Sequence, residues 1–205
     1  MPGVRTHDTI TVVSGGALAP FIYIALRSQD LSQEVALQNT VLLVGAHLLS
    51  GIMFSPDLDI DSAIDNRWGV LFWIWRPYMW AVPHRSRWLS HGLIIPPLLR
   101  LGYFFISATL VFLGLAWVLG QFGVIVPNYH EQAVQYLLQL TRQRPREVLL
   151  VLLGFITGGA AHSIADWLVT GGKRFLRRLG LRVTRDYTGH DQWRRYPRER
   201  YPRVW

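Results

Sequence analysis

Four stretches of the chain are rich in apolar residues and contain no charged side chain. They cover residues 9–26, 35–56, 101–129 and 148–165. A membrane-spanning helix needs roughly 20 apolar residues, and a helix that is apolar on every face, as over 101–129, must lie in lipid or inside a protein. A chain of 205 residues has no interior large enough for that helix. The pattern therefore predicts an all-α integral membrane bundle of about four transmembrane helices.

The first stretch, 9–26, is the shortest, and Gly15, Gly16 and Pro20 interrupt it. One alternative is a cleaved signal peptide, but neither a multi-basic leader nor a convincing small-residue cleavage site accompanies it. Another is a helix that only lies on the membrane surface. That would leave three spans and would place the N-terminus and the 57–100 segment on opposite sides of the membrane.

Composition and charge support the membrane class and orient the chain. Half of the residues are hydrophobic and 17% are charged, whereas soluble domains carry about 25% charged residues. Cytoplasmic flanks of membrane helices carry the excess of Lys and Arg. With four spans, most Lys and Arg residues lie on one side of the membrane. The other side holds only Arg27, Arg142, Arg144 and Arg146. We therefore expect both termini and the 57–100 segment to be cytoplasmic.

The remaining segments complete the expected organisation. A membrane domain over 1–172 includes an interfacial motif segment over 55–100, and a basic cytoplasmic tail follows over 173–205. The tail is suited to anionic lipid headgroups or to a membrane protein partner. No nucleic-acid partner is expected, because no nucleic-acid-binding fold accompanies the tail.

Three local features carry further expectations. Aromatic residues crowd the 68–88 segment, as is typical of a membrane interface, and we expect Pro77 to break any helix there. The 127–147 segment is expected to be a loop. The small residues from Gly158 to Ala161 should allow close packing of the fourth helix against a neighbour.

Metal-binding side chains gather at one end of the predicted bundle. The chain has no cysteine, so any metal must be held by His and carboxylate groups. His162 and Asp166 are four residues apart and share a helix face, and Asp57 and Asp59 would point the same way in an extended stretch. His47 lies about 15 Å of helix before Asp57, and we leave it out of the site as a core residue. The cytoplasmic ends of the four spans together present His7, Asp8, Asp57, Asp59, His84, His91, His162 and Asp166.

Such a His and Asp set suits zinc, or manganese or iron, bound as one or two divalent ions. Bundle cores commonly build metal sites from side chains on facing helices. Each motif taken singly is unspecific, but their convergence predicts a metal site.

The order of these motifs resembles a known family. His7, SPDLD (55–59), HRSRWLSH (84–91) and HSIAD (162–166) resemble the membrane-bound metal-dependent hydrolases. They resemble more closely the cyanobacterial metal-binding membrane proteins of unknown function, which are similar also in RWG, WRPY, HRS and SH. The resemblance covers about residues 5–171 and implies metal ligands at His7, Asp57, Asp59, His84, His91, His162 and Asp166.

The chain departs from the hydrolase pattern at two points. Ile60 and then Asp61 follow the second Asp of SPDLD, where the hydrolases have His. The gap between His84 and His91 is also longer than in the hydrolases. These departures leave open whether one ligand is lost or replaced by Asp61.

Three functions remain open. The first is a metal-dependent hydrolase of phosphoester or lipid-type substrates at the cytoplasmic membrane face. In it, Asp61 or Asp8 acts as the base, and Arg85, Arg87 and Arg100 hold the phosphate. The second is a non-catalytic subunit or assembly factor of a membrane complex, in which the metal staples the helices. The third, a metal transporter, predicts ligands near the membrane midplane and fits the clustering at one end least well.

Overall fold

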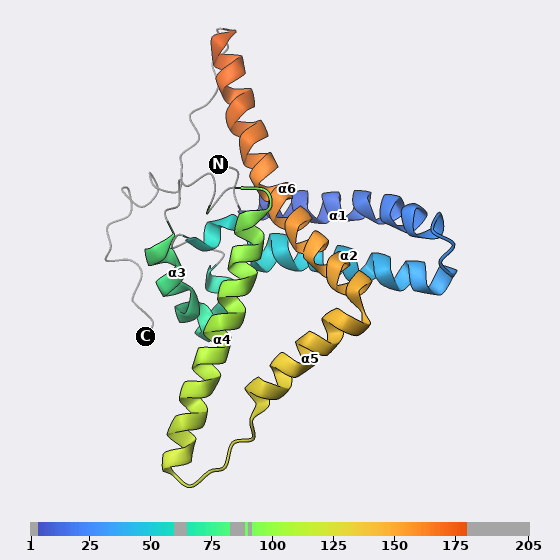
Figure 1. Ribbon diagram of the computed structural model, residues 1–205. Helices are drawn as coiled ribbons and strands as arrows, with labels where there is room; N and C mark the ends of the chain where they lie inside the picture. The colour runs from blue at the N-terminus through green and yellow to red at the C-terminus, as the bar shows by residue number, and fades with distance from the viewer. Residues whose placement is uncertain (1–3, 60–64, 83–88, 90–91, 180–205) are drawn as a thin grey trace, which may run out of the picture.

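The fold is helical throughout the described part of the chain (Figure 1). A computed structural model describes residues 4–59, 65–82, 89 and 92–179. Within them, two 3-10 segments, η1 (Pro56–Asp59) and η2 (Asp65–Trp75), lie between the second and third α-helices. The α-helices are α1 (Val4–Arg27), α2 (Gln33–Met53), α3 (Arg76–Ala81), α4 (Ile95–Gln121), α5 (Tyr129–Gln143) and α6 (Pro145–Arg178). Of these, α1, α2, α4 and α6 are long and apolar enough to cross a membrane, as the sequence predicts.

The tightest packing is between α2 and α6, where glycines on α6 leave room for the backbone of α2. A Cβ on Gly158 would strike the carbonyl oxygen of His47, and a Cβ on Gly154 would strike the α2 backbone one turn away. The hydroxyl of Ser50 donates a hydrogen bond across the same contact to the carbonyl of Phe155, at 2.7 Å. The prediction of close packing at the small residues of the last span is confirmed.

His47 joins α1 to this pair. Its Nε2 lies 3.1 Å from the carbonyl oxygen of Thr11 and 3.0 Å from Oγ of Ser14, both on α1, and its Nδ1 lies 3.1 Å from Oγ1 of Thr157 on α6. A carbonyl oxygen can only accept, so we infer that Nε2 carries the ring proton. The imidazole is buried, and it links three helices through hydrogen bonds.

A cluster of aromatic rings holds η2 and α3 against α2 and α4. The ring of Phe54 meets four others at centroid distances of 5.2–5.7 Å, among them Trp68 and Trp75. Trp75 is fully buried, whereas Trp73 and Trp80 are exposed. The inward-facing rings therefore belong to the core, and the expectation that the 68–88 segment lies along a membrane interface stays a prediction.

Pro77 starts a helix instead of breaking one. It occupies the first turn of α3, where the missing N–H of proline costs no hydrogen bond.

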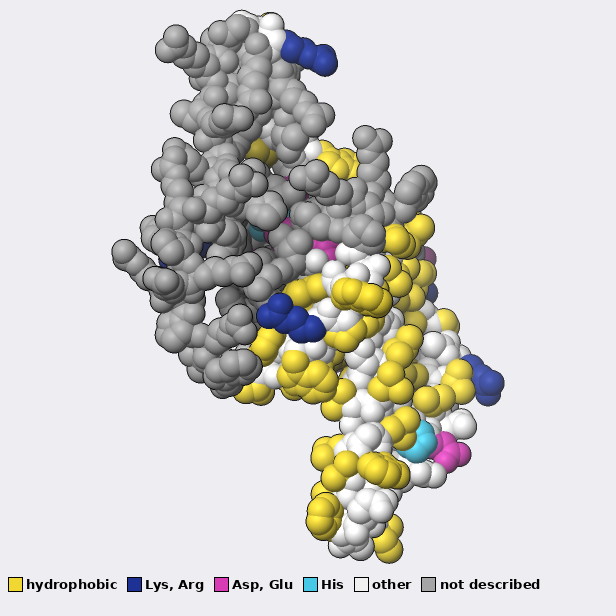
Figure 2. Space-filling view, turned by 90° about the vertical axis from the view of Figure 1, so that its left-hand side faces the viewer, with side chains coloured by type: hydrophobic (Ala, Val, Ile, Leu, Met, Phe, Trp, Pro, Cys, Tyr) yellow, Lys and Arg dark blue, Asp and Glu magenta, His cyan; other side chains and the backbone are white. Residues whose placement is uncertain are grey.

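Helix α4 joins the other spans only by its first turns. Pro96, Pro97 and Arg100 are buried there, and Pro97 packs against Gly159 of α6. Beyond them, none of the most apolar part of α4 is buried. With α5 it forms an arm that diverges from the other helices, and hydrophobic side chains are spread along this arm among polar ones (Figures 1 and 2). The compact bundle expected from the sequence is thus formed by α1, α2 and α6, because a helix that is apolar on every face has no single stripe to direct its packing.

Two predicted boundaries also change. The third span was expected to run over 101–129, but α4 ends at Gln121, and Gly123 then adopts φ 76°. A left-handed glycine is a common helix terminator. The predicted 127–147 loop contains α5, which has no buried residue. Its low hydropathy hides an amphipathic pattern, because its apolar residues recur at helical spacing among polar ones.

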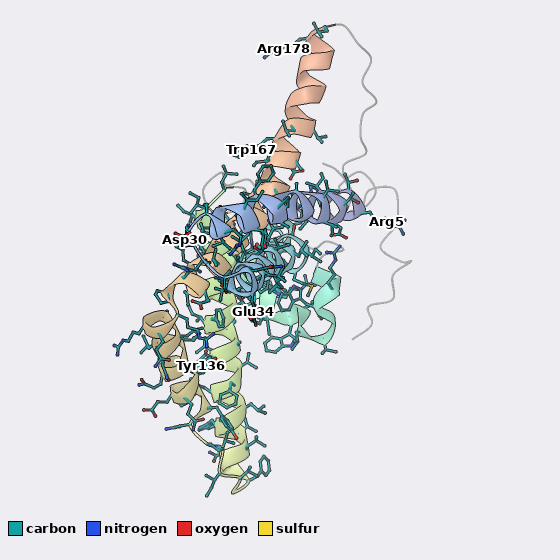
Figure 3. All side chains as sticks on the ribbon, turned by 90° about the vertical axis from the view of Figure 1, so that its right-hand side faces the viewer. Arg5, Asp30, Glu34, Tyr136, Trp167 and Arg178 are labelled. Atoms are coloured by element: carbon teal, nitrogen blue, oxygen red, sulfur yellow. The ribbon has the colours of Figure 1, made fainter. Side chains whose placement is uncertain are left out.

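Helix α6 is the longest element and continues past α1 on one side of the molecule (Figure 3). Its middle carries the packing glycines, and its following turns carry His162 and Asp166. The contact between α2 and α6 therefore sets where those side chains lie.

The α2–α6 contact predicts that two glycine substitutions differ in their effect on the free energy of unfolding. Gly158→Ala should lower the free energy of unfolding by about 1–3 kcal/mol, because the added methyl group overpacks the contact. Gly45→Ala on α2 is the control. A Cβ there meets no atom within 4 Å, so the change should be neutral or should stabilise by about 0.5–1 kcal/mol. Thermal unfolding in detergent measures both, and equal stability of the two variants would contradict the proposed packing.

Candidate metal centre

Side chains from three separate elements meet at one end of the α1–α2–α6 bundle. His7 of α1, Asp57 of η1 and His162 of α6 each offer one ligand atom, and these atoms all lie within 4.8 Å of one another. The two imidazole rings are stacked, with centroids 3.7 Å apart and planes 11° from parallel. Oδ2 of Asp57 lies 3.7 Å from Nε2 of His162.

Asp166 adds a second carboxylate beside both imidazoles. Its Oδ1 lies 3.6 Å from Nε2 of His7, and its Oδ2 lies 3.5 Å from Nε2 of His162. Its position one helical turn after His162 puts the two side chains on one face of α6, as the spacing predicts. The cluster therefore offers two imidazoles and two carboxylates.

The spacing within this cluster fits a metal ion better than direct hydrogen bonds. The nitrogen–oxygen distances of 3.5–3.7 Å exceed the usual 2.7–3.2 Å of such a bond. Ligand atoms around a tetrahedral ion with bonds of about 2.0–2.1 Å lie ~3.3 Å apart. Both ring nitrogens of His7 and Nε2 of His162 are buried and have no hydrogen-bond partner among the described residues. Buried polar atoms of this kind call for a bound species, so the donor set fits a divalent metal.

Ser55 orients one of the two imidazoles. Its Oγ lies 3.0 Å from Nδ1 of His162, and both residues are fully buried. A hydrogen bond to one ring nitrogen fixes the plane of the ring and directs the other nitrogen to the metal. Here it directs Nε2 of His162 towards Asp57 and Asp166. Ser55 is the first residue of SPDLD, but the sequence alone gives no sign of this orienting role, because His162 lies far away in the chain.

Asp8, one of the two predicted bases, is held by an arginine that the sequence analysis missed. Nη2 of Arg67 donates to Oδ2 of Asp8 at 2.6 Å, and Nη1 donates to the carbonyl of Ile52 at 2.7 Å. Arg67 therefore ties the start of α1 to the end of α2. The catalytic role of Asp8 stays a prediction.

Asp59 and Arg100 lie beside Tyr78 in the interior. Arg100 and Asp59 are both buried. Burial raises the pKa of the Tyr78 hydroxyl, and the nearby positive charge of Arg100 opposes this increase only in part, so Tyr78 is a neutral phenol. The proposed roles of Asp59 as a ligand and of Arg100 as a phosphate contact stay predictions.

Comparison with known families adds an independent observation. A family model described as uncharacterized metal-binding protein (DUF2227) matches residues 2–176. The chain belongs to the DUF2227 family. No curated protein and no solved structure matches the chain. Membership of DUF2227 supports the metal-binding part of the sequence resemblance, and the hydrolase activity and the cyanobacterial affiliation stay predictions.

The other His, Asp and Arg residues considered for the site in this DUF2227 chain either lie elsewhere in the structure or fall outside its described residues. His47 does not belong to the ligand group found among the described residues, and its ring nitrogens bond to α1 and α6 instead. The others, predicted as ligands, base or phosphate contacts, lie outside the described residues: Asp61, His84, Arg85, Arg87 and His91.

Metal content tests the centre directly. Protein purified in detergent should carry one or two equivalents of a divalent metal by mass spectrometry. Asp57→Asn and His162→Gln should each lower this content at least tenfold, because each removes a donor atom from the cluster. Asp30→Asn is the control, since Asp30 lies in the turn between α1 and α2. A metal-free wild-type protein would contradict the assignment.

Ser55→Ala tests the orientation of His162. Loss of a hydrogen bond to a ligating His typically weakens metal binding 10–100-fold, so metal titration should show a loss in that range. Ser50→Ala is matched to it, because Ser50 is also a buried serine, and its hydroxyl bonds to the carbonyl of Phe155 on α6 and not to His162. It should cost about 1 kcal/mol of stability and leave the affinity unchanged. Equal metal affinities of the two variants would contradict a positioning role for Ser55.

Proposed function

We propose that the protein is an integral membrane metalloprotein that hydrolyses phosphoester bonds of lipid-type substrates at the cytoplasmic membrane face. The observation that carries this proposal is the set of buried imidazole nitrogens of His7 and His162, which face the carboxylates of Asp57 and Asp166 without direct hydrogen bonds. In a chain of the DUF2227 family, this cluster offers the nitrogen and oxygen donors that a divalent metal needs.

The exposed surface of α4 supports the membrane location. Ile106, Leu110 and Trp117 are 63–69% exposed, although soluble proteins rarely expose large continuous apolar patches. A bilayer would cover this helix on every face. In that setting the positive-inside rule places both termini and the metal centre on the cytoplasmic side.

The donor set narrows the metal. Imidazole nitrogens combined with carboxylates suit zinc, manganese or iron, whereas calcium and magnesium prefer shells made of oxygen. Zinc sites with three protein ligands keep a position open for water or substrate, and closed sites with four ligands are structural. His7, Asp57 and His162 supply the first three donors, and Asp166 is the candidate fourth.

A divalent ion bound there would supply Lewis-acid chemistry, which activates water and stabilises charge on a phosphoryl group. The residues of the chain would do the rest. Ser55 holds the ring of His162 in place, and Arg67 holds the carboxylate of Asp8, whose backbone neighbour is His7. The side chain of Asp8 is 35% exposed, so water can reach it, and we assign it the role of the base.

A structural role for the metal is the second candidate. One observation favours it: the donors come from α1, η1 and α6, so a bound ion would fasten the first and last helices of the bundle to the segment after α2. In that case the protein would serve as a subunit or assembly factor of a membrane complex.

Two measurements separate these functions. The protein is stripped with a chelator, reloaded with zinc, manganese or iron, and assayed with bis(p-nitrophenyl) phosphate and with phospholipid vesicles. Hydrolysis should require the metal, and Asp8→Asn should lower kcat at least tenfold while metal content stays intact. Metal-dependent thermal stability without turnover on any of these substrates would contradict the hydrolase and support the structural role.

A further inference from the structure

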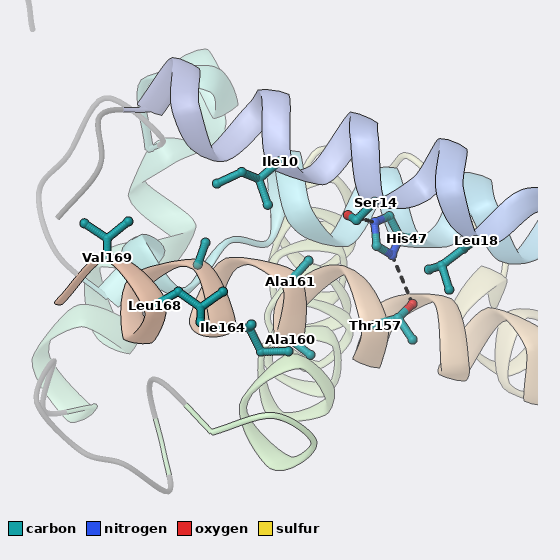
Figure 4. A pocket seen from close by; sticks show the side chains of 11 residues that line it. Ile10, Ser14, Leu18, His47, Thr157, Ala160, Ala161, Ile164, Leu168 and Val169 are labelled. Carbon is teal, nitrogen blue, oxygen red and sulfur yellow. Dashed lines mark hydrogen bonds between the residues drawn. The ribbon is translucent and has the colours of Figure 1, made fainter. Parts of the chain in front are cut away.

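A groove of about 520 Å³ runs along the contact between α1 and α6 (Figure 4). Ile10 and Leu18 line it from α1, and Ala161, Ile164 and Leu168 line it from α6. The small alanine side chains of α6 leave the space that the larger aliphatic side chains surround. His47, Ser14 and Thr157 lie at one end, and their polar atoms bond to one another.

The groove is suited to a hydrocarbon chain. Its walls are aliphatic, and the polar groups at its end are already hydrogen-bonded, so water or a polar ligand would find few partners there. Thr157 and Val169 mark its extent on α6 and are twelve residues apart, which is about 18 Å of helix. One leaflet of a bilayer has a hydrocarbon depth of about 15 Å, half of the ~30 Å core.

The groove also lies beside the metal centre. Ile10 follows His7 by three residues on α1, and Ala161 and Ala165 directly precede His162 and Asp166 on α6. The groove and the ligand cluster therefore occupy neighbouring faces of the same helical turns. A molecule that filled both would need an apolar chain and a polar end.

All the lining residues on α1 and α6 fall within the two candidate membrane spans Arg5–Arg27 and Pro145–Val169. If these helices cross a bilayer as proposed above, the hydrocarbon layer surrounds the groove, and a lipid can enter it sideways without passing through water.

We propose that the α1–α6 groove binds one acyl chain of a bilayer lipid and so brings the polar end of that lipid to the His7–Asp57–His162 centre. This inference rests on the proposed function, which it deepens by naming a membrane lipid as the substrate. The acyl chain held in the groove would limit the movement of the lipid's polar end. Holding a reacting group in place in this way lowers the entropic cost of reaction.

Photolabelling in proteoliposomes tests the groove without using activity. The probe is phosphatidylglycerol with a diazirine in its acyl chain, and labelled residues are located by mass spectrometry. Labelling of Ile10, Leu18 and Ala161, which line the groove and are half-buried, should exceed that of exposed α4 residues such as Leu110 several-fold, because exposed α4 residues meet only exchanging bulk lipid. Even labelling of α4 and the groove would overturn the proposal.

Variants that fill the groove sharpen the test. Ala161→Phe and Leu18→Trp should each lower groove labelling several-fold. Ala17→Phe is the matched control, because Ala17 is exposed on α1 and does not line the groove. Leu18 lies eleven residues along α1 from His7, so Leu18→Trp should retain its metal and its helix content even if Ala161→Phe fails to fold. Unchanged labelling in a folded Leu18→Trp variant would overturn the proposal.

Three further results separate this inference from a dimer contact, from the metal centre and from the proposed hydrolysis. The chain has no cysteine, so Leu168→Cys is a single reporter, and its oxidation to a disulfide-linked dimer in proteoliposomes would assign the groove to a second copy and overturn lipid binding. Asp57→Asn should lose metal and keep groove labelling. Strong labelling in a wild-type protein that hydrolyses no phosphoester would support the groove and contradict only the proposed hydrolysis.

Discussion

The close approach of α2 and α6 is the constraint on which the site depends. Glycines at 154 and 158 let the two backbones touch, and bulkier residues there would displace α6 by the width of a side chain. His162 lies one turn after Gly158, so any displacement would move its imidazole away from Asp57. Without a large hydrophobic driving force between helices in lipid, such close contacts and a few hydrogen bonds hold helices together.

Polar groups inside the bundle reinforce this geometry. His47 and Ser50 of α2 bond to α1 and α6 at successive turns, and Ser55, just after the end of α2, bonds to His162. The contacts of α2 are structural, whereas the contact of the residue that follows it orients a candidate metal ligand. The end of α2 is fixed in turn by Arg67, which bonds both to its last-turn carbonyl and to α1.

Much of the fold and of the site follows from the sequence, for physical reasons that differ between elements. The four long apolar helices were predictable because each corresponds to a long run of apolar residues without a charge. The convergence of His7, Asp57 and His162 followed from topology alone, since odd and even helix ends alternate sides. The divergence of α4 was not predictable in this way, because a helix that is apolar on every face has no stripe that directs its packing. The sequence of α5 does carry an amphipathic pattern, but a search for apolar runs overlooks it because polar residues interrupt them. The roles of Ser55 and Arg67 depend on contacts between distant segments, which no local pattern encodes.

The ligands of the centre lie almost at opposite ends of the folded domain in sequence, at His7 and at His162 and Asp166. The ribosome therefore releases the first ligand long before the last one exists. A nascent chain that ends before α6 has only His7 and Asp57 of the cluster and holds an ion no better than a short peptide does. Metal loading becomes possible only when α6 has packed into place, so a bound ion would mark chains whose helical bundle is complete.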